Sequence, residues 1–348
     1  MGTGNLTIDL DAVARNWKAL DRLSAPSVET AATVKADGYG LGGDKVARAL
    51  LDVGVRSFFV ANASEGTAIR KAIGDASRIF CYSGHMAGDT DLIGGFGIVP
   101  LLNSVEQLDR HFEALPNMSF GIQLDTGMNR LGMEPEDWSA VRNTALSRNP
   151  QILISHLACA DDAKNAMNER QLKRFREMAY GEGARLSLAA TGGILLGPEF
   201  HFDLTRPGIG LYGGLPFRDA CPVVTLSLPV IQTRRVRAGE TVGYGNSWTA
   251  KRDSLIATVA AGYADGVLRS LSNRATLMAG GSPCPLVGRV SMDLVTVDIT
   301  HLDHAPETLD LICEYRGIDE LAAAADTIGY EILTSLGARY TRSYRGAK

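Results

Sequence analysis

The feature that most constrains the fold is an alternation of two hydrophobic periodicities along the first two-thirds of the chain. Short apolar runs rich in β-branched and aromatic residues predict strands, and apolar residues three or four positions apart predict helices between them. About eight such alternations are typical of a (β/α)8 barrel, although an open doubly wound α/β sheet would show much the same pattern. The predicted strands cover Thr30–Lys35, Ser57–Ala61, Arg78–Tyr82, Ile98–Leu102, Ser119–Asp125, Gln151–His156, Arg185–Ala190 and Gly208–Tyr212.

The pattern changes after about Pro222, where β-rich segments with Gly- and Pro-rich connections follow one another. Helical periodicity is nearly absent from there to Asp319–Asp326. We therefore expect a second, mainly β domain over residues 223–348.

Composition narrows the class of partners. The net charge of −4 gives no electrostatic reason to expect nucleic acid. No apolar stretch approaches the roughly 20 residues of a membrane span, and the first residues lack the pattern of a secretion signal, so we expect a cytoplasmic protein. The five cysteines are scattered, which predicts reduced thiols. His301 and His304 have metal-like spacing but no further ligands nearby, so no metal is expected.

Lys35 ends an apolar strand and runs directly into a glycine-rich turn. Burial of an ammonium group is unfavourable unless the charge is paired or removed. A lysine that forms a Schiff base avoids much of this cost and gains a chemical role. The alternative, more frequent for a strand-end lysine taken alone, is a side chain whose ammonium reaches solvent at the barrel rim.

The same turn also matches a dinucleotide-binding pattern. Gly38, Gly40 and Gly43 have the required spacing, and Glu65 follows at about the right distance. A second match at Gly208–Gly213 shows how easily this pattern arises in a chain with 38 glycines. NAD binding is therefore kept as a minor alternative.

Four further polar residues lie near the ends of predicted barrel strands. Arg130 follows the fifth strand, His156 ends the sixth, Thr191 follows the seventh and Arg206 precedes the eighth. Each alone has a structural explanation, as a rim ion pair, a core histidine or a helix cap. In a barrel, however, the carboxyl ends of the strands form the active site. We therefore expect these residues and Lys35 to line one open cavity at that end of the barrel, here called the cup.

At this point five segments resemble motifs of the alanine racemase family, in the order of that family. The resemblance implies a barrel that binds pyridoxal phosphate, a C-terminal β domain and a head-to-tail homodimer. It also implies that the N-terminal strand joins the β domain, so that the barrel would cover residues 11–222 and the second domain residues 223–348 together with 1–10. The matching segments are Val34–Gly40, Asp125–Gly132, Arg206–Gly213, Gly262–Gly266 and Gly288–Asp293.

The resemblance implies a two-base mechanism that interconverts L- and D-alanine. Lys35 would carry the cofactor as an internal aldimine, and Tyr263 of the partner subunit would lie on the opposite face of the cofactor. His156 and Arg206 would lie behind that tyrosine, with Arg206 also facing the pyridine nitrogen. An arginine does not readily give up its proton, so this nitrogen would stay unprotonated.

The resemblance also assigns the binding residues. The phosphate would be held by Tyr39, Thr191, Gly208 and Ile209. The substrate carboxylate would be bound by Arg130 and by the backbone N–H of Met292.

The chain departs from the family pattern at Gln123, where many members have a carbamylated lysine that fixes the arginine. Two lesser departures concern the cofactor: Ala190 replaces an asparagine, and the phosphate-binding tyrosine aligns strictly with Ala338, with Tyr340 and Tyr344 nearby as alternatives. Because the departure at Gln123 affects the carboxylate-binding arginine, an amino-acid racemase of broader specificity remains an alternative.

Two other pyridoxal-phosphate proteins are weaker alternatives. A basic amino-acid decarboxylase would need a cysteine that Gly262–Gly266 does not supply. A non-catalytic carrier would lack both the β domain and a counterpart of Tyr263.

Overall fold

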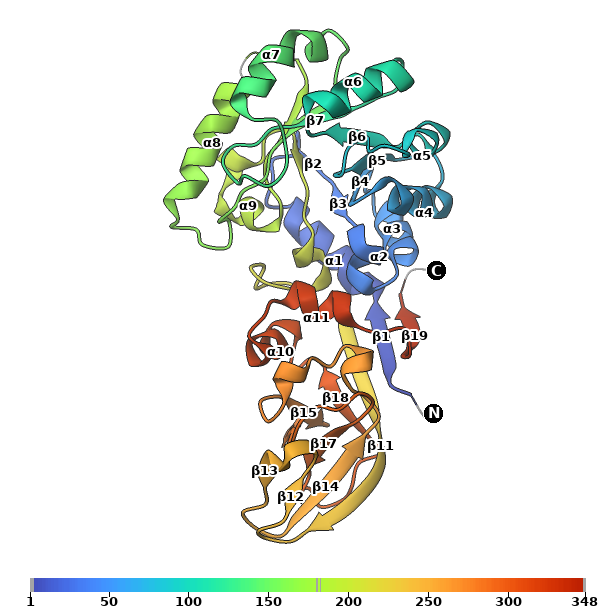
Figure 1. Cartoon of the computed structure of the whole chain (residues 1–348), viewed down its shortest axis with the longest axis vertical. Helices are drawn as coiled ribbons and strands as arrows, with labels where there is room; N and C mark the ends of the chain where they lie inside the picture. Colours follow the sequence, from blue (N-terminus) through green and yellow to red (C-terminus); the bar gives the residue numbers. More distant parts are fainter. Residues whose placement is uncertain (1–2, 180, 182, 347–348) are drawn as a thin grey trace. The chain divides into compact units, whose positions relative to one another are not determined.

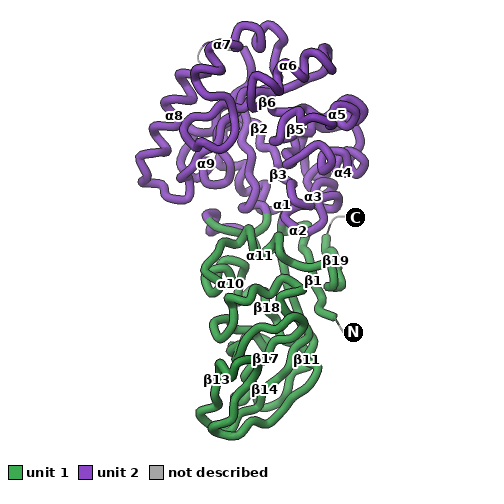
Figure 2. The backbone as a smooth tube through the Cα atoms, viewed as in Figure 1, with its two compact units in different colours: residues 1–12, 212–215, 221–348 green, residues 13–211, 216–220 purple. Residues whose placement is uncertain are grey.

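The computed structural model describes residues 3–179, 181 and 183–346 and divides into two compact units (Figure 2). The first, here called the barrel unit, comprises Val13–Leu211 and Pro216–Ala220. The second, the β unit, comprises Met1–Ala12, Tyr212–Leu215 and Cys221–Lys348. The beginning of the chain and its C-terminal third therefore belong to the same unit.

The strands of the barrel unit are parallel and follow one another in chain order (Figure 1). β2 (Glu29–Thr30) is followed along the chain by a seven-stranded sheet, whose strands are β3 (Ala32–Thr33), β4 (Ser57–Val60), β5 (Arg78–Cys81), β6 (Val99–Leu102), β7 (Gly121–Gln123), β8 (Ile152–Ile154) and β9 (Arg185–Ser187).

The last strand, β10 (Leu204–Thr205), closes the ring. It pairs in parallel with β2, and the Ala31 N–H donates to the Thr205 carbonyl at 2.8 Å. On the other side the Arg206 N–H donates to the Ala189 carbonyl, just beyond β9, at 2.9 Å. This closure excludes the open doubly wound sheet.

Helices alternate with these strands, and polar side chains begin several of them. Asn62 accepts a hydrogen bond from the Glu65 N–H, and Ser104 accepts one from the Gln107 N–H, which satisfies first-turn donors. Within the described ranges, every helix is too short or too polar to cross a membrane. The helices are α1 (Leu10–Asp21), α3 (Gly43–Asp52), α4 (Ala63–Ile73), α5 (Thr90–Phe96), α6 (Val105–Ala114), α7 (Pro135–Leu146), α8 (Ala166–Met178) and α9 (Thr191–Leu196).

The interior of the barrel is filled by apolar side chains from several strands. The rings of Phe59 and Phe80 stack with their centroids 4.8 Å apart. Ala31, Leu101 and Leu204 are fully buried around them. Parallel strands buried on both faces read as continuous apolar runs, which is why the sequence predicts most of them.

The predicted strand Gly208–Tyr212 is wrong. Its last four residues form a single 3-10 turn, η2 (Ile209–Tyr212). The backbone N–H groups of Gly208 and Gly210 donate to the hydroxyl oxygen of Thr191, at 3.0 and 3.3 Å, instead of to a neighbouring strand. Arg206 therefore follows the last barrel strand, β10, and does not precede it as predicted.

The β unit is built around one long strand, β11 (Val224–Val236). β11 pairs antiparallel with β1 (Asn5–Asp9), β14 (Ser254–Val259) and β18 (Thr308–Ile312). β1 also pairs in parallel with β19 (Thr341–Arg345). The prediction of a (β/α)8 barrel followed by a mainly β domain is confirmed.

The remaining strands of the β unit extend its sheets, and the helices α10 and α11 follow near its C-terminal end. β14 pairs with β17, β15 with both β16 and β18, and β12 with β13. These elements are β12 (Thr241–Val242), β13 (Trp248–Thr249), β15 (Thr276–Ala279), β16 (Ser282–Pro285), β17 (Val295–Asp298), α10 (Ile318–Ala325) and α11 (Gly329–Ser335).

Candidate active site

Lys35 follows β3 and opens a left-handed turn, α2 (Lys35–Gly40). Residues 36–39 all have φ between 52° and 63°, and only one of them is glycine. Left-handed backbone costs an L-residue about 1–2 kcal/mol, so such a run persists only where surrounding groups hold it. The chain thus places strained backbone directly beside the candidate cofactor lysine.

Two carboxylates hold this turn. Asp37 accepts a hydrogen bond from the Gly43 N–H at 2.7 Å. The two oxygens of Glu65 accept from the N–H groups of Ala36 and Ala61, at 3.0 and 2.8 Å. Both Glu65 oxygens therefore bind backbone, which argues against the ribose-binding role that a dinucleotide site would require.

The ammonium group of Lys35 lies among aromatic and cationic neighbours. Its nitrogen is 5.8 Å from the ring centroid of Tyr82, which follows β5. Lys35 is half-buried, so its amine is neither sequestered in the core nor free on the surface. This position suits an amine that must react with a ligand in the cup.

Arg206 is among the largest fully buried side chains of the described residues and is only 1% exposed. Its Nη2 donates to the Ser155 carbonyl at 2.7 Å, its Nη1 donates to the Ser187 hydroxyl, and its Cζ lies 5.7 Å from the Phe59 ring centroid. Its Nε is buried and has no hydrogen-bond partner among the described residues. An unpaired buried donor is costly, so this N–H is suited to an acceptor on a ligand.

The electrostatic surroundings of His156 indicate that the predicted site residues of the barrel unit lie close together. Burial is the main cause that lowers the pKa of His156 to about 3, and the positive charges of Arg206, Arg130 and Lys35 lower this pKa further. A charge acts this way only at short range in a protein. The structure therefore brings these four residues into one electrostatic neighbourhood, in which the imidazole is neutral at pH 7.

Thr191, Tyr39 and Gly208 form a second polar group. Thr191 is buried at the start of α9, and because its hydroxyl oxygen accepts from Gly208 and Gly210, its own proton is left to donate elsewhere. A Cβ added at Gly208 would lie 2.3 Å from the Tyr39 hydroxyl oxygen. Because any larger residue at 208 would collide with the Tyr39 hydroxyl, glycine is required at this position. The hydroxyl and backbone N–H groups gathered here are of the kind that binds a phosphate. Ile209 begins η2 beside them.

Arg130 lies in the loop after β7 and is exposed. Gln123 is buried in β7, and its Nε2 donates to the Leu131 carbonyl at 3.3 Å. The Oε1 of Gln123 is buried without a hydrogen-bond partner among the described residues. The position at which the chain departs from the family pattern thus retains an unused acceptor.

Tyr263 and Met292 belong to the β unit and lie on neighbouring turns. The Tyr263 N–H donates to the Ser291 carbonyl, and the Ala264 N–H donates to the Met292 carbonyl, each at 3.0 Å. The Tyr263 side chain is 45% exposed and that of Met292 is 53% exposed. The structure therefore groups these two residues with each other in the β unit.

Sequence reasoning missed the ionic contacts beneath these turns. Asp265 and Asp293 lie in the segments Gly262–Gly266 and Gly288–Asp293, but the sequence pattern predicts no role for either carboxylate and gives no sign of Arg339. The one available signal is the spacing of Asp265 three residues after Gly262, whose N–H donates to this carboxylate at 2.9 Å. In the part of the chain that the structure describes, no three His, Cys, Asp or Glu side chains are grouped as a metal site.

Comparison with known proteins identifies the family. The model of the alanine racemase N-terminal domain matches residues 8–216, and that of the alanine racemase C-terminal domain matches residues 223–344. An alanine racemase of Cereibacter sphaeroides is 61% identical over 344 residues, which cover 99% of each chain.

Solved structures of alanine racemases are similar to this chain over nearly its whole length. The alanine racemase from Bartonella henselae with covalently bound pyridoxal phosphate superposes with a TM-score of 0.94 at 36% identity, over 99% of this chain and 100% of that one. The biosynthetic alanine racemase from Pseudomonas aeruginosa has a TM-score of 0.94 at 34% identity, with the same coverage. Because the two domain matches follow one another in the order of the family and span nearly all residues, the chain belongs to the alanine racemase family.

Proposed function

We propose that this chain is a pyridoxal-phosphate-dependent isomerase that interconverts L- and D-alanine. The observation that carries this proposal is the cup in which Lys35, His156 and Arg206 meet, in a chain that is 61% identical to an alanine racemase over nearly its full length. Membership of this family favours racemisation over decarboxylation and over a carrier without catalysis.

The residues of the cup fit pyridoxal phosphate. Lys35 offers the amine, and the unpartnered Nε of Arg206 offers a buried donor for the ring nitrogen. Tyr39, Thr191, Gly208 and Ile209 would hold the phosphate. When bound, the cofactor supplies an electron sink that acidifies the Cα–H of an amino acid.

Within this cup each residue has a limited task. The guanidinium of Arg206 keeps its protons, so beside the ring nitrogen of a bound cofactor it would donate a hydrogen bond without giving up a proton, which would weaken the electron sink. The amine of Lys35 takes or returns the proton on one face of Cα, and the phenol of Tyr263 of the partner subunit does so on the other face. His156 is neutral, so its imidazole can accept a hydrogen bond in this group. Arg130 and the backbone N–H of Met292 would bind the substrate carboxylate.

The assembly and the setting are part of the same proposal. Tyr263 and Met292 are large apolar side chains left exposed next to one another, as expected of a surface that a second copy covers. We propose a head-to-tail homodimer in the cytoplasm that supplies D-alanine for cell-wall peptides. We also propose residues 11–222 as the barrel domain and residues 223–348 with 1–10 as the second domain.

A broader-specificity amino-acid racemase is the second candidate. Gln123 supports it, because a glutamine cannot be carbamylated and its Oε1 has no partner among the described residues. Arg130 would then be oriented differently from its counterpart in family members that have the carbamylated lysine. A change in the orientation of the carboxylate-binding arginine would alter which side chains the cup accepts.

The purified protein tests the reaction directly. After incubation with L-alanine in deuterium oxide, we expect loss of the α-proton signal in NMR together with D-alanine in chiral chromatography. Exchange without any D-alanine would reject racemisation. A panel of alanine, serine, lysine and arginine separates the two candidates, because only the broader enzyme racemises all four at similar rates.

Chemical trapping tests the cofactor residue. Borohydride reduction and peptide mapping should label Lys35, and a label on another lysine would contradict this role. Tyr263→Phe should slow proton transfer on one face of Cα about 100-fold or more, and much less on the other. Equal and mild losses of proton transfer on the two faces of Cα would reject the two-base scheme.

A further inference from the structure

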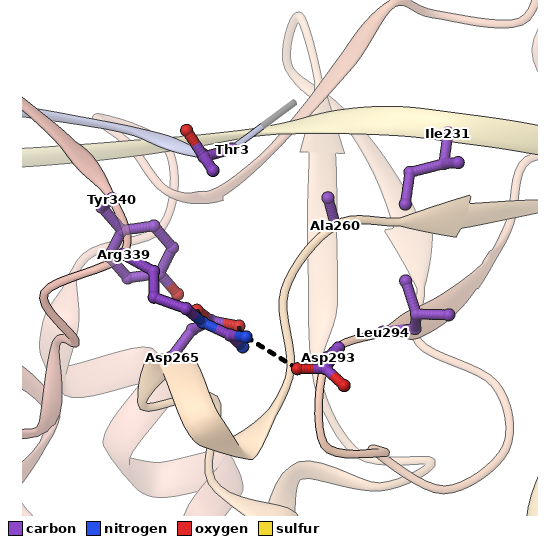
Figure 3. Close-up of a pocket in the computed structure, with 9 residues that line it drawn as sticks. Thr3, Ile231, Ala260, Asp265, Asp293, Leu294, Arg339 and Tyr340 are labelled. Carbon is purple, nitrogen blue, oxygen red and sulfur yellow. Dashed lines mark hydrogen bonds and ion pairs between the residues drawn. The ribbon is translucent and has the colours of Figure 1, made fainter. Parts of the chain in front are cut away.

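One guanidinium connects three segments of the β unit that are far apart in the sequence. Arg339 lies just before β19, and its Nε and Nη2 donate to the two oxygens of Asp265 at 2.6 and 2.7 Å. Its Nη1 donates to Asp293 at 2.7 Å. Figure 3 shows Arg339 between the two carboxylates at the edge of a pocket. The planar fork of arginine allows this arrangement, which the single ammonium of lysine cannot reproduce.

Asp265 depends on this contact. It is 5% exposed and ends η4 (Tyr263–Asp265), the short turn that begins with Tyr263. Apart from Arg339, the Gly262 N–H donates to its carboxylate. A buried carboxylate deprived of its counter-charge is strongly unfavourable, so the turn would have to open or rearrange without Arg339. Asp265 and Asp293 in turn raise the pKa of Arg339 above its ordinary value through their hydrogen bonds and charges.

The second carboxylate, Asp293, directly follows Met292. The turn of Met292 and the turn of Tyr263 are in backbone contact, since a Cβ added at Gly262 would lie 2.2 Å from the Met292 carbonyl oxygen. Two backbone hydrogen bonds join these turns, from Tyr263 to Ser291 and from Ala264 to Met292. Arg339 joins the same two turns again, through side chains.

We propose that Arg339 is a positioning residue for racemisation. By binding Asp265 and Asp293 together, it holds the phenol of Tyr263 and the backbone N–H of Met292 in a fixed relation. The proposal rests on the proposed function, which gives Tyr263 and Met292 their roles. A misplacement of about 1 Å at a reacting group can cost about 100-fold in rate, so a loosened turn would reduce turnover even though Arg339 touches neither substrate nor cofactor.

Arg339→Lys and Arg339→Gln test this role in the cofactor-loaded enzyme. Lysine keeps the positive charge and can pair with one carboxylate at a time, so that folding is retained even if the glutamine variant is too unstable to purify. We expect Arg339→Lys to lower kcat about 10- to 100-fold, and to slow proton transfer more on the face of Cα that Tyr263 serves than on the other. KM for alanine should also rise, because the turn of Met292 is loosened.

Arg274→Ala is the matched control. Arg274 forms an exposed ion pair with Asp326 in the same unit, and this pair involves neither Asp265 nor Asp293, so its loss should leave kcat and KM in both directions unchanged. Equal losses for Arg274→Ala and Arg339→Lys would overturn the proposal, since a general effect of surface charge would then explain both.

Amide hydrogen exchange gives a readout that does not depend on turnover. In Arg339→Lys the amides of Tyr263 and Ala264 should exchange at least about tenfold faster than in the wild-type enzyme, whereas those of β14 should keep their rates. Unchanged exchange at these amides would overturn the proposal. In Tyr263→Phe/Arg339→Lys the two losses should be less than additive, and full additivity would contradict action through Tyr263. Failure of the proposed function itself would show separately, as a wild-type chain that does not racemise alanine.

Discussion

In the barrel unit Arg206 is 1% exposed and bonded to backbone and hydroxyl groups, whereas in the β unit Tyr263 is 45% exposed on a short turn. The first is fixed by the surrounding core, and the second by the segment beneath it, through backbone hydrogen bonds and the Arg339 ion pairs. A buried group contributes to stability as well as to chemistry. An exposed group can be changed with little effect on folding, so the two units should respond differently to substitution.

The largest expected effect separates Arg206 from Tyr263. Arg206→Ala removes hydrogen bonds from a buried charged group and leaves a cavity and an unsatisfied Ser155 carbonyl, which should lower the free energy of unfolding by about 2–4 kcal/mol. Tyr263→Phe removes one hydroxyl and keeps the aromatic ring that a second copy would cover, so this variant should stay within about 0.5 kcal/mol of the wild type. Urea unfolding at one protein and cofactor concentration measures both. Similar losses of unfolding free energy in the two variants would contradict the claim that Arg206 contributes more to stability than the Tyr263 hydroxyl.

A smaller effect concerns pH. The pKa of His156 is lowered to about 3, below the ordinary value of 6.5, so the unfolded chain binds more protons between these two values. This contribution to stability is complete above pH 6.5 and is lost as the pH falls towards 3. Between pH 7 and pH 5 the loss should be about 1–2 kcal/mol.

His156→Gln isolates this contribution. The variant should lose less unfolding free energy than the wild type between pH 7 and pH 5. Burial also lowers the pKa values of His85 and His111, but this pair is present in both proteins and cancels in the difference. Identical pH slopes would show that His156 is not held neutral by the cup.

The smallest expected effect tests the strain beside Lys35. Ala36 is exposed and has φ of 52°, so Ala36→Gly should raise the free energy of unfolding by up to about 1 kcal/mol. Ala140→Gly, at an exposed position inside the right-handed helix α7, should lower it by about 0.5–1 kcal/mol. Thermal or urea unfolding measures both the expected gain in unfolding free energy for Ala36→Gly and the expected loss for Ala140→Gly. A destabilised Ala36→Gly would mean that the turn carries no strain.

Much of the barrel was predictable because its strands are buried on both faces and appear in the sequence as short apolar runs. Ser57–Ala61 predicted β4 almost to the residue. Gly208–Tyr212 was apolar for a different reason, since it packs as a turn whose N–H groups bind Thr191. A hydrogen bond between residues 17 positions apart leaves no periodicity by which a strand and a turn can be distinguished.

For the candidate site, position at strand ends was the useful signal. Lys35 and His156 were found because they end or follow apolar strands, and parallel strands bring their carboxyl ends together. Arg339 could not be found this way. Its contact with Asp265 joins residues 74 positions apart, and it depends on how two turns of the β unit fold against each other.

The pairing of β1 with β19 has a consequence for synthesis. The hydroxyls of Thr7 and Ser343 are 3.0 Å apart although 336 positions separate them. At roughly 5–20 residues per second, the ribosome finishes the second strand tens of seconds after the first. During that interval Leu6 and Ile8, both fully buried in the finished protein, have no β19 beside them. The nascent chain therefore carries an unpaired strand edge that chaperones can bind until translation ends.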